Sequence, residues 1–219
     1  MTFSTVELTS TFFHIPDTRT IDKWVRTTPD GFRFAAIFPR SVTHEGDLGS
    51  RVEEIRRFLA IMAGFKHKLG PLLMQFPASF GPESRAILME LLRQLQPGLK
   101  VAAAFRHRDW FRSETYKLLR AHGVALCLSD YPVFPRRMIK TADFVYMRFV
   151  GDRETISEDF SHVRLSRTQE LRSWAEIAKQ FRNEKTEIYA YFSNHFSGHA
   201  PSTAAEFREM LGGTADEKP

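Results

Sequence analysis

Short apolar runs recur along the chain, and each of them stops at a polar or ionisable residue. The clearest run, V-A-A-A-F at residues 101–105, is followed at once by Arg106 and His107. Comparable runs end at Gln75, at Ser129 and Asp130, at Arg148, and at Ser193 and Asn194. Strands buried in a parallel sheet are apolar along most of their length, and parallel barrels carry their sites at the carboxyl ends of the strands. The pattern therefore predicts buried parallel strands that deliver polar side chains to one face.

Helical periodicity fills the intervals between these runs. Expected strands lie near residues 4–8, 32–38, 72–76, 100–106, 124–129, 144–149 and 187–192. Expected helices cover residues 51–68 and residues 202–211. Between them, one helix is expected from Pro82 to Pro97 and another around Tyr116, ending at Gly123. A further helix is expected to begin at a capping box formed by Ser166 and Gln169. About seven strands interleaved with helices indicate a parallel α/β sheet or barrel.

No linker or low-complexity segment divides the sequence. We expect one domain over residues 1–211, followed by a polar tail over residues 212–219. The segment 150–164 is long, charged and poor in apolar residues. We interpret it as an ordinary surface loop, with a mobile lid over the strand ends as the alternative.

Composition narrows the class of protein only a little. The 219 residues carry a formal charge of +5 and a pI near 9.5, with the basic residues spread along the chain. The single cysteine, Cys127, lies in an apolar run, so a core position is expected and no intrachain disulfide can form. The sequence shows no signal-peptide pattern and no stretch of roughly 20 apolar residues. We expect a soluble, cytoplasmic protein with no membrane partner.

Sequence motifs for common cofactors are missing. The chain has no G-x-G-x-x-G or G-x-x-x-x-G-K phosphate loop and no G-x-S-x-G elbow, which argues against nucleotide-cofactor enzymes and common serine hydrolases, and no redox cofactor is expected. It also has no H-E-x-x-H or C-x-x-C motif. No bound metal is therefore expected, although Glu7, His107, Asp130 and His195 are residue types that bind metals.

Glu7, Arg106 and His107 are the first candidates for a ligand site. Glu7 lies at an expected strand end, where it can act as a base, bind a ligand hydroxyl, or pair with a neighbouring arginine. Consecutive strand residues face opposite ways, so Arg106 and His107 cannot both enter the mouth of a barrel unless the chain turns there. The guanidinium of Arg106 can hold a carboxylate or phosphate with two hydrogen bonds, or form a salt bridge to Asp109 or Glu7.

Five further residues complete the candidate site. Asp130 and Arg148 follow neighbouring strands, and an ion pair between them would line the mouth. The amides of Gln75 and Asn194 suit hydrogen bonds to a sugar-like or amide ligand. His44 lies six residues after an expected strand, on a loop, where a histidine is more often exposed than catalytic.

The segment 131–140 combines aromatic and basic residues. A nucleic-acid base could stack on Phe134 while Arg136 and Arg137 face phosphates, as in single-strand binding loops. A solvated loop with ordinary charges is the alternative, and we favour it.

Several motifs together carry a family resemblance. They are T-V-E-L-T-S-T-F-F-H-I-P (5–16), P-R-S-V-T-H (39–44), L-G-P-L-L-M-Q-F-P-A-S-F (69–80), A-F-R-H-R-D-W (104–110), T-A-D-F-V-Y-M-R (141–148) and Y-F-S-N (191–194). Over nearly its whole length the sequence resembles the YecE-like proteins, also called domain of unknown function 72. The resemblance implies a TIM-type (β/α) barrel and no settled reaction. It also implies a first strand that this sequence does not show, so we expect a barrel of about seven strands, incomplete at its N-terminus.

The sequence departs from the family at polar positions. Ile37 replaces a strand-end lysine, Ala104 a glutamate and Val150 a histidine, while Thr9 and Ser193 stand where the family has asparagine. A carboxylate and a lysine are the groups that an acid–base site can least afford to lose. These replacements count against family-type catalysis in this chain.

The residues support three hypotheses of function. We favour a barrel that binds a small, polar, anionic ligand at its carboxyl-end face, with acid–base chemistry if it is an enzyme. One alternative is a nucleic-acid-associated protein that uses its basic surface. The other is a catalytically degenerate family member that acts in binding or regulation. Because an incomplete barrel exposes two strand edges, we also expect an upstream start, a partner chain over the gap, or marginal stability.

Overall fold

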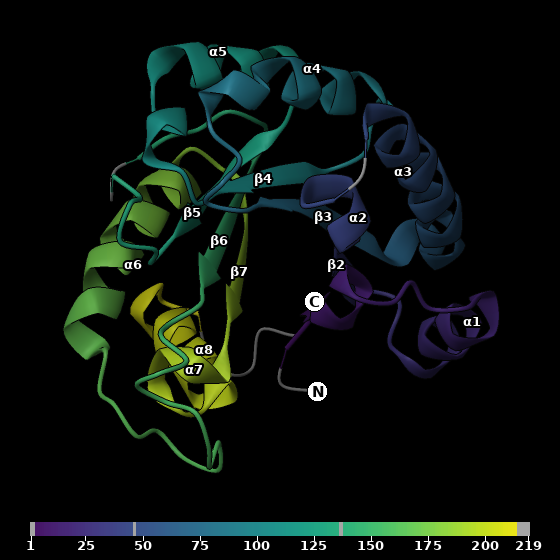
Figure 1. Ribbon diagram of the computed structural model, residues 1–219. Helices are drawn as coiled ribbons and strands as arrows, with labels where there is room; N and C mark the ends of the chain where they lie inside the picture. The colour runs from purple at the N-terminus through teal and green to yellow at the C-terminus, as the bar shows by residue number, and fades with distance from the viewer. Residues whose placement is uncertain (1–2, 46, 136–137, 214–219) are drawn as a thin grey trace.

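Seven parallel strands form one continuous sheet in the computed structural model, which describes residues 3–45, 47–135 and 138–213. The strands are β1 (Thr5–Leu8), β2 (Arg33–Ile37), β3 (Leu69–Phe76), β4 (Val101–Phe105), β5 (Ala125–Ser129), β6 (Phe144–Phe149) and β7 (Glu187–Phe192). Each strand pairs in parallel with the one before it. The sheet curls into a nearly closed barrel of the TIM type (Figure 1), and the expected fold is confirmed.

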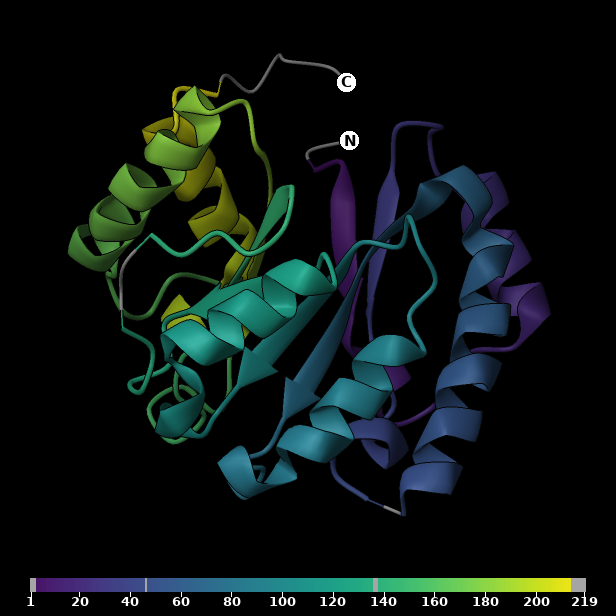
Figure 2. The ribbon, with the colours of Figure 1, turned by 90° about the horizontal axis from the view of Figure 1, so that it is seen from above.

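Helices surround the sheet on its outer side (Figures 1 and 2). They are α1 (Thr18–Thr27), α2 (Arg40–Thr43), α3 (Leu48–Met62), α4 (Arg85–Arg93), α5 (Ser113–Ala121), α6 (Thr168–Asn183), α7 (Asn194–Ser197) and α8 (Ala200–Met210). Short 3₁₀ helices cover η1 (Thr9–Phe12), η2 (Ala63–Lys68), η3 (Pro82–Ser84) and η4 (Arg108–Trp110). Among the described residues, no helix is long and apolar enough to cross a membrane.

The two faces of the strands build two separate apolar layers. Side chains that point inward fill the barrel, and they are Ala35, Ile37, Leu73, Ala102, Ala125, Cys127, Phe144, Tyr146, Tyr189 and Tyr191. Side chains on the other face pack beneath the helices, where Phe34 stacks on Phe65 and Phe105 stacks on Trp110. A polar residue at a strand end therefore points into the barrel mouth or beneath a helix according to its position in this alternation.

Two expectations about helices need correction. The Ser166–Gln169 capping box does not form, because α6 begins at Thr168 and the Ser166 hydroxyl lies 3.2 Å from the Thr168 hydroxyl instead. Helix α1 has no counterpart among the expected helices. Its apolar residues Ile21, Trp24 and Val25 recur at helical spacing, and it begins after Asp17, whose side chain accepts a 2.7 Å hydrogen bond from the Thr20 backbone.

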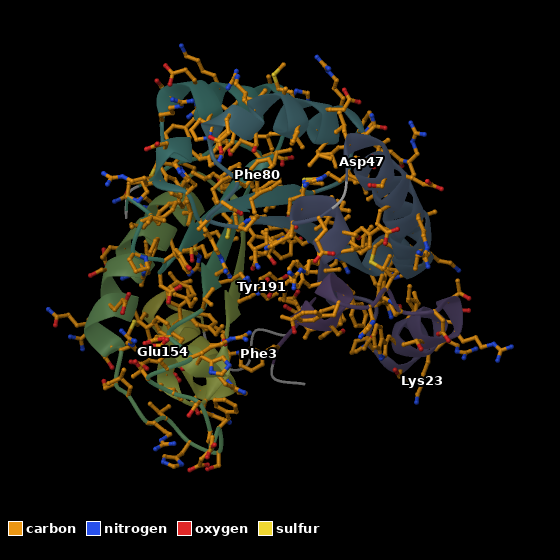
Figure 3. All side chains as sticks on the ribbon, in the orientation of Figure 1. Phe3, Lys23, Asp47, Phe80, Glu154 and Tyr191 are labelled. Carbon is orange, nitrogen blue, oxygen red and sulfur yellow. The ribbon has the colours of Figure 1, made fainter. Side chains whose placement is uncertain are left out.

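The barrel has one open side, between β7 and β1. Within the described residues no backbone hydrogen bond joins these two strands. Instead, the hydroxyls of Thr5 and Tyr191 are hydrogen-bonded at 2.9 Å across the opening. Figure 2 shows β1 (purple) at this opening, and Figure 3 places Phe3 and Tyr191 beside it.

Candidate ligand site at the barrel mouth

A cavity of about 1830 Å³ opens at the carboxyl ends of the strands and continues down the open side of the barrel. Its lining at the mouth includes Glu7, Thr9, His44, Gln75, Arg106, Arg148, Val150, Ser193, Asn194 and His195. Its lining along the open side includes Phe3, Val6, Phe32, Ala190, Phe192 and Ala204. Six of the eight candidate residues thus line one cavity, whereas His107 and Asp130 do not.

Four hydrogen-bonded side chains from three strands form the floor of the mouth. The Tyr146 hydroxyl donates to Glu7 Oε1 at 2.5 Å, and Arg148 Nε donates to Glu7 Oε2 at 3.0 Å. Arg148 Nη1 also donates to Gln75 Oε1. The side chains of Glu7 and Arg148 are only 6% and 16% exposed. Glu7 therefore pairs with an arginine from a distant part of the sequence.

Burial and charge set the protonation of this group. Burial, and then the Glu7 carboxylate, raise the pKa of Tyr146 well above its ordinary value, so the phenol stays protonated and donates. Burial alone would lower the pKa of Arg148, but the Glu7 carboxylate outweighs it and the net pKa is raised. An ion pair removed from water adds little net stability, and such groups in a cavity are typical of functional sites.

Arg106 extends into the cavity from the end of β4. Its guanidinium lies 5.3 Å from the centre of the Tyr131 ring. Among the described residues it forms no ion pair with a carboxylate, so neither of the salt bridges considered for it, to Asp109 or to Glu7, is made. A half-buried guanidinium that stacks on an aromatic ring and has no carboxylate partner in the described part of the chain keeps N–H donors available for a ligand.

His44 lies next to this arginine, at the end of α2. Its Nδ1 is 2.8 Å from the Thr43 hydroxyl, and the edge of the Phe12 ring packs against it. Burial, followed by the positive charges of Arg40 and Arg106, lowers the pKa of His44 below its ordinary value of 6.5. His44 is therefore neutral at neutral pH and half-buried rather than exposed on a loop.

His107 lies outside the cavity, so the prediction that it contributes to the mouth is wrong. It precedes η4, where its Nδ1 accepts a 3.3 Å hydrogen bond from the Asp109 backbone. The alternation of the strand explains this outcome, because Ala104 and Arg106 face the inside of the barrel and His107 faces away.

Asp130 does not pair with Arg148, contrary to the sequence-based expectation. Its two carboxylate oxygens accept hydrogen bonds from the backbone nitrogens of Val150 and Gly151, at 2.8 and 2.7 Å. Gly151 has a φ of +68°, and a Cβ there would collide with the His195 carbonyl, so the turn requires glycine. Asp130 holds the chain as it leaves β6, and Arg148 is left to pair with Glu7.

The segment after β6 is held at both of its ends. His195 Nδ1 lies 2.6 Å from the Ile156 carbonyl oxygen, and the backbone nitrogens of Arg164 and Leu165 donate to the Ser197 carbonyl at 2.7 and 3.0 Å. These contacts favour the surface-loop interpretation over a mobile lid. Asn194 also has a structural contact, because its Oδ1 accepts a 2.8 Å hydrogen bond from the backbone of Ala200, at the start of α8.

Two other sequence interpretations are settled by burial. Cys127 is buried inside the barrel, as expected, and burial raises the pKa of its thiol. Phe134 is also buried, against Phe111 and Trp174, so it offers no exposed ring for a nucleic-acid base, which counts against the alternative hypothesis for this segment. Its companions in that hypothesis, Arg136 and Arg137, lie outside the described residues.

The residue types expected to favour metals are dispersed. In the described part of the chain, no group of three or more His, Cys, Asp or Glu side chains is arranged to hold a metal ion. Glu7, His107, Asp130 and His195 each contact a different partner, as described above.

Sequence reasoning missed two tyrosines that help to build the site. Tyr146 was interpreted only as an apolar strand residue, although it anchors Glu7, and Tyr191 spans the open side of the barrel to Thr5. The signal was present in the spacing, because Tyr146 lies two positions before Arg148 and therefore faces the same side of β6.

Fold and site together define a TIM-type (β/α) barrel with a polar cavity at the carboxyl ends of its strands. The family model described as "Protein of unknown function DUF72" matches residues 1–219. The chain belongs to this family, and the resemblance seen in its motifs is confirmed.

Relatives and solved structures agree with this assignment. UPF0759 protein YunF of Bacillus subtilis is 23% identical over 95% of this chain and 83% of that protein. UPF0759 protein YecE of Escherichia coli K12 is 28% identical over 50% of this chain and 40% of that protein. A DUF72 family structure from Enterococcus faecalis V583 has a TM-score of 0.81 at 23% identity, covering 99% of this chain and 88% of its own. Another, from Thermotoga maritima MSB8, has a TM-score of 0.75 at 30% identity, covering 96% and 85%.

Proposed function

We propose that the mouth of the barrel binds a small polar anion, which Arg106 holds above the buried group of Glu7, Tyr146, Arg148 and Gln75. The observation that carries this proposal is the state of Arg106. It is a half-buried cation that lines the cavity and makes no ion pair with any described carboxylate. A guanidinium presents a rigid fork of donors that matches a carboxylate or a phosphate.

The surroundings of Arg106 favour an anion over a cation. The Glu7 carboxylate, which also lines the mouth, is already neutralised by Arg148. Neutral His44 offers a hydrogen bond beside Arg106 without a net charge of its own. Among the side chains of Arg106, His44, Glu7 and Arg148, an anion entering the mouth therefore meets one cation without a carboxylate partner and no carboxylate without a cation.

Acid–base chemistry, if it occurs here, falls to Glu7. Its carboxylate lies at the inner end of the cavity and is held in place by two donors. Ile37 and Ala104 stand on inward-facing positions of β2 and β4, and Val150 lines the cavity just beyond β6, where the family resemblance would have given polar groups. We therefore place ligand binding ahead of catalysis in this chain.

Isothermal titration calorimetry tests the proposal with inorganic phosphate and malonate as anionic probes and glycerol as a neutral one. The native protein is expected to bind at least one anion and not glycerol. Arg106→Ala should weaken that binding at least tenfold. The matched control, Arg172→Ala, removes an exposed arginine of α6 and should leave affinity unchanged. Absence of anion binding, or equal binding by Arg106→Ala, would overturn the proposal.

A further inference from the structure

His195, in the short helix α7 just after β7, is held in one orientation at the wall of the cavity. Its backbone nitrogen donates to the Ser193 hydroxyl oxygen at 3.2 Å, and its Nδ1 lies 2.6 Å from the Ile156 carbonyl oxygen. Its ring meets the Phe160 ring at 89°, with the ring centres 5.1 Å apart. His195 lines the cavity, whereas Ile156 and Phe160 do not. The imidazole is therefore supported from behind by the segment that follows β6.

The contact with Ile156 decides which nitrogen of the His195 ring is free. A carbonyl oxygen only accepts hydrogen bonds, so Nδ1 carries the hydrogen and donates it. In the neutral ring, Nε2 then has the lone pair. Among the described residues Nε2 has no hydrogen-bond partner, and it is not one of the buried atoms in that condition. Nε2 is thus an accessible acceptor on a side chain that lines the cavity.

Glu7 adds further acceptors on the same flank of the mouth. Its strand, β1, is linked to β7 by the hydrogen-bonded hydroxyls of Thr5 and Tyr191. One oxygen of the Glu7 carboxylate accepts from Tyr146 and the other from Arg148, although each carboxylate oxygen has lone pairs for two hydrogen bonds. The flank formed by β7 and β1 therefore presents acceptors that a ligand with donor groups can use.

Arg106 stands across the mouth from these acceptors. It follows β4, which is three strands away from β7 in the order of the sheet. Adjacent strands lie about 4.8 Å apart, so the axes of β4 and β7 are separated by at most about 14 Å. The side chains of Arg106 and His195 line the same cavity from its two sides and shorten this distance. A ligand that contacts both needs an anionic group at one end and hydrogen-bond donors at the other.

We propose that the mouth binds a polyhydroxylated anion of the sugar-phosphate class, whose phosphate contacts Arg106 and whose hydroxyls donate to His195 Nε2 and to Glu7. The assignment rests on the anion site proposed above and adds the chemical class of its ligand. Hydroxyls suit this flank because they donate to its lone pairs. An alkyl phosphate would cover the same acceptors without giving them donors, which weakens binding.

Isothermal titration calorimetry of the full chain with glucose 6-phosphate and cyclohexylmethyl phosphate tests this ligand class. Both probes carry a phosphate on a six-membered ring, and only glucose 6-phosphate has hydroxyls. The native protein should bind glucose 6-phosphate at least tenfold more tightly. His195→Asn keeps an amide N–H that can donate to the Ile156 carbonyl and lacks the Nε2 acceptor, so this preference should fall at least fivefold. The matched control His122→Asn changes an exposed histidine away from the mouth and should keep the native preference.

The outcomes separate the ligand class from the anion site on which it rests. If the native protein binds both probes equally and Arg106→Ala weakens both, the anion site stands and the ligand class is wrong. If neither probe binds, both proposals are overturned. If His195→Asn weakens both probes by the same factor, His195 only supports the segment after β6, and its assigned contact with the ligand is overturned. Hydrogen exchange at the Ile156 amide, which donates to the Asp152 carbonyl at 3.2 Å, should keep its native rate in His195→Asn.

Discussion

The Tyr146 hydroxyl, on β6, donates a 2.5 Å hydrogen bond to the carboxylate of Glu7, on β1. These strands are not neighbours in the sheet, and both lie near the open side of the barrel. Arg148 reaches the same carboxylate from β6. Side chains inside the barrel therefore connect the two flanks of the opening, where no backbone ladder does so among the described residues.

Glu7 and Arg148 should show strong energetic coupling in a double-mutant cycle. Glu7→Gln leaves a buried guanidinium without its counter-charge, and we expect a loss of about 3 kcal/mol in the free energy of unfolding. Arg148→Met should cost a similar amount, because it leaves the carboxylate unpaired. The double variant should be clearly more stable than the sum of the two losses implies. Urea denaturation measures all three, and additive losses would show that the pair is not coupled.

Stability should fall at alkaline pH, and Tyr146 should contribute to the fall. The pKa of Tyr146 in the folded protein lies well above its ordinary value of 10.0, which the unfolded chain keeps. Tyr146 therefore contributes fully to the free energy of unfolding below pH 10. This contribution is lost as the pH rises above 10, because the phenol then loses its proton in the unfolded state but keeps it in the folded state.

Tyr146→Phe tests this directly. The variant should be less stable than the native protein at pH 8, because Glu7 loses a hydrogen bond. Between pH 9 and 11 its free energy of unfolding should decline less steeply. If denaturant titrations show that the free energy of unfolding declines equally in both proteins across that range, the assignment to Tyr146 is wrong.

The thiol of Cys127 should be unreactive in the folded protein. It lies inside the barrel, and burial raises its pKa above the ordinary value of 9.0, so little thiolate forms at pH 8. Reaction with 5,5′-dithiobis(2-nitrobenzoate) should be at least a hundredfold faster in denaturant than in native buffer. Rapid stoichiometric labelling of the native protein would show that the interior is accessible through the open side.

Asp130 should control the order of the chain after β6. Asp130→Asn replaces one of the two acceptor oxygens with an NH₂ donor that faces a backbone N–H. The free energy of unfolding should therefore fall by about 1–2 kcal/mol. Hydrogen exchange should accelerate at Val150 or at Gly151, because one of these two amides loses its acceptor. As a control, the backbone amide of Leu126, which donates a 2.7 Å hydrogen bond to the Thr141 hydroxyl, should exchange as before. Unchanged exchange at both glycine and valine would contradict the assigned role.

The strands of this fold could be predicted because their signals are local. Each apolar run lies in a short stretch of sequence, and all seven runs form strands within about three residues of the expected bounds. Helix α1 was missed although its signals are local as well, because Ile21, Trp24 and Val25 follow helical spacing and Asp17 is a favourable N-cap residue. The Ser166 cap failed because the hydroxyl had a second local partner in Thr168.

The site was harder to predict because its partners are distant in sequence. Alternation along β4 indicated that Arg106 and His107 would not both enter the mouth, since that argument needs only neighbouring residues, but it did not say which of them would. The partner of Arg148 could not be derived in the same way. Asp130 follows the adjacent strand, whereas Glu7, the actual partner, lies 141 positions away and reaches Arg148 through the inside of the barrel. Only the curling of the sheet into a nearly closed barrel brings them together.

The central claim, an anion held at the mouth by Arg106, is tested most directly by an NMR titration of the histidine side chains with and without inorganic phosphate. A phosphate bound beside Arg106 stabilises the protonated imidazole of His44, so the lowered pKa of His44 should rise on binding. The side-chain signals of the exposed His122, which does not line the mouth, should not respond to phosphate. A pKa of His44 that stays unchanged at saturating phosphate would contradict the account.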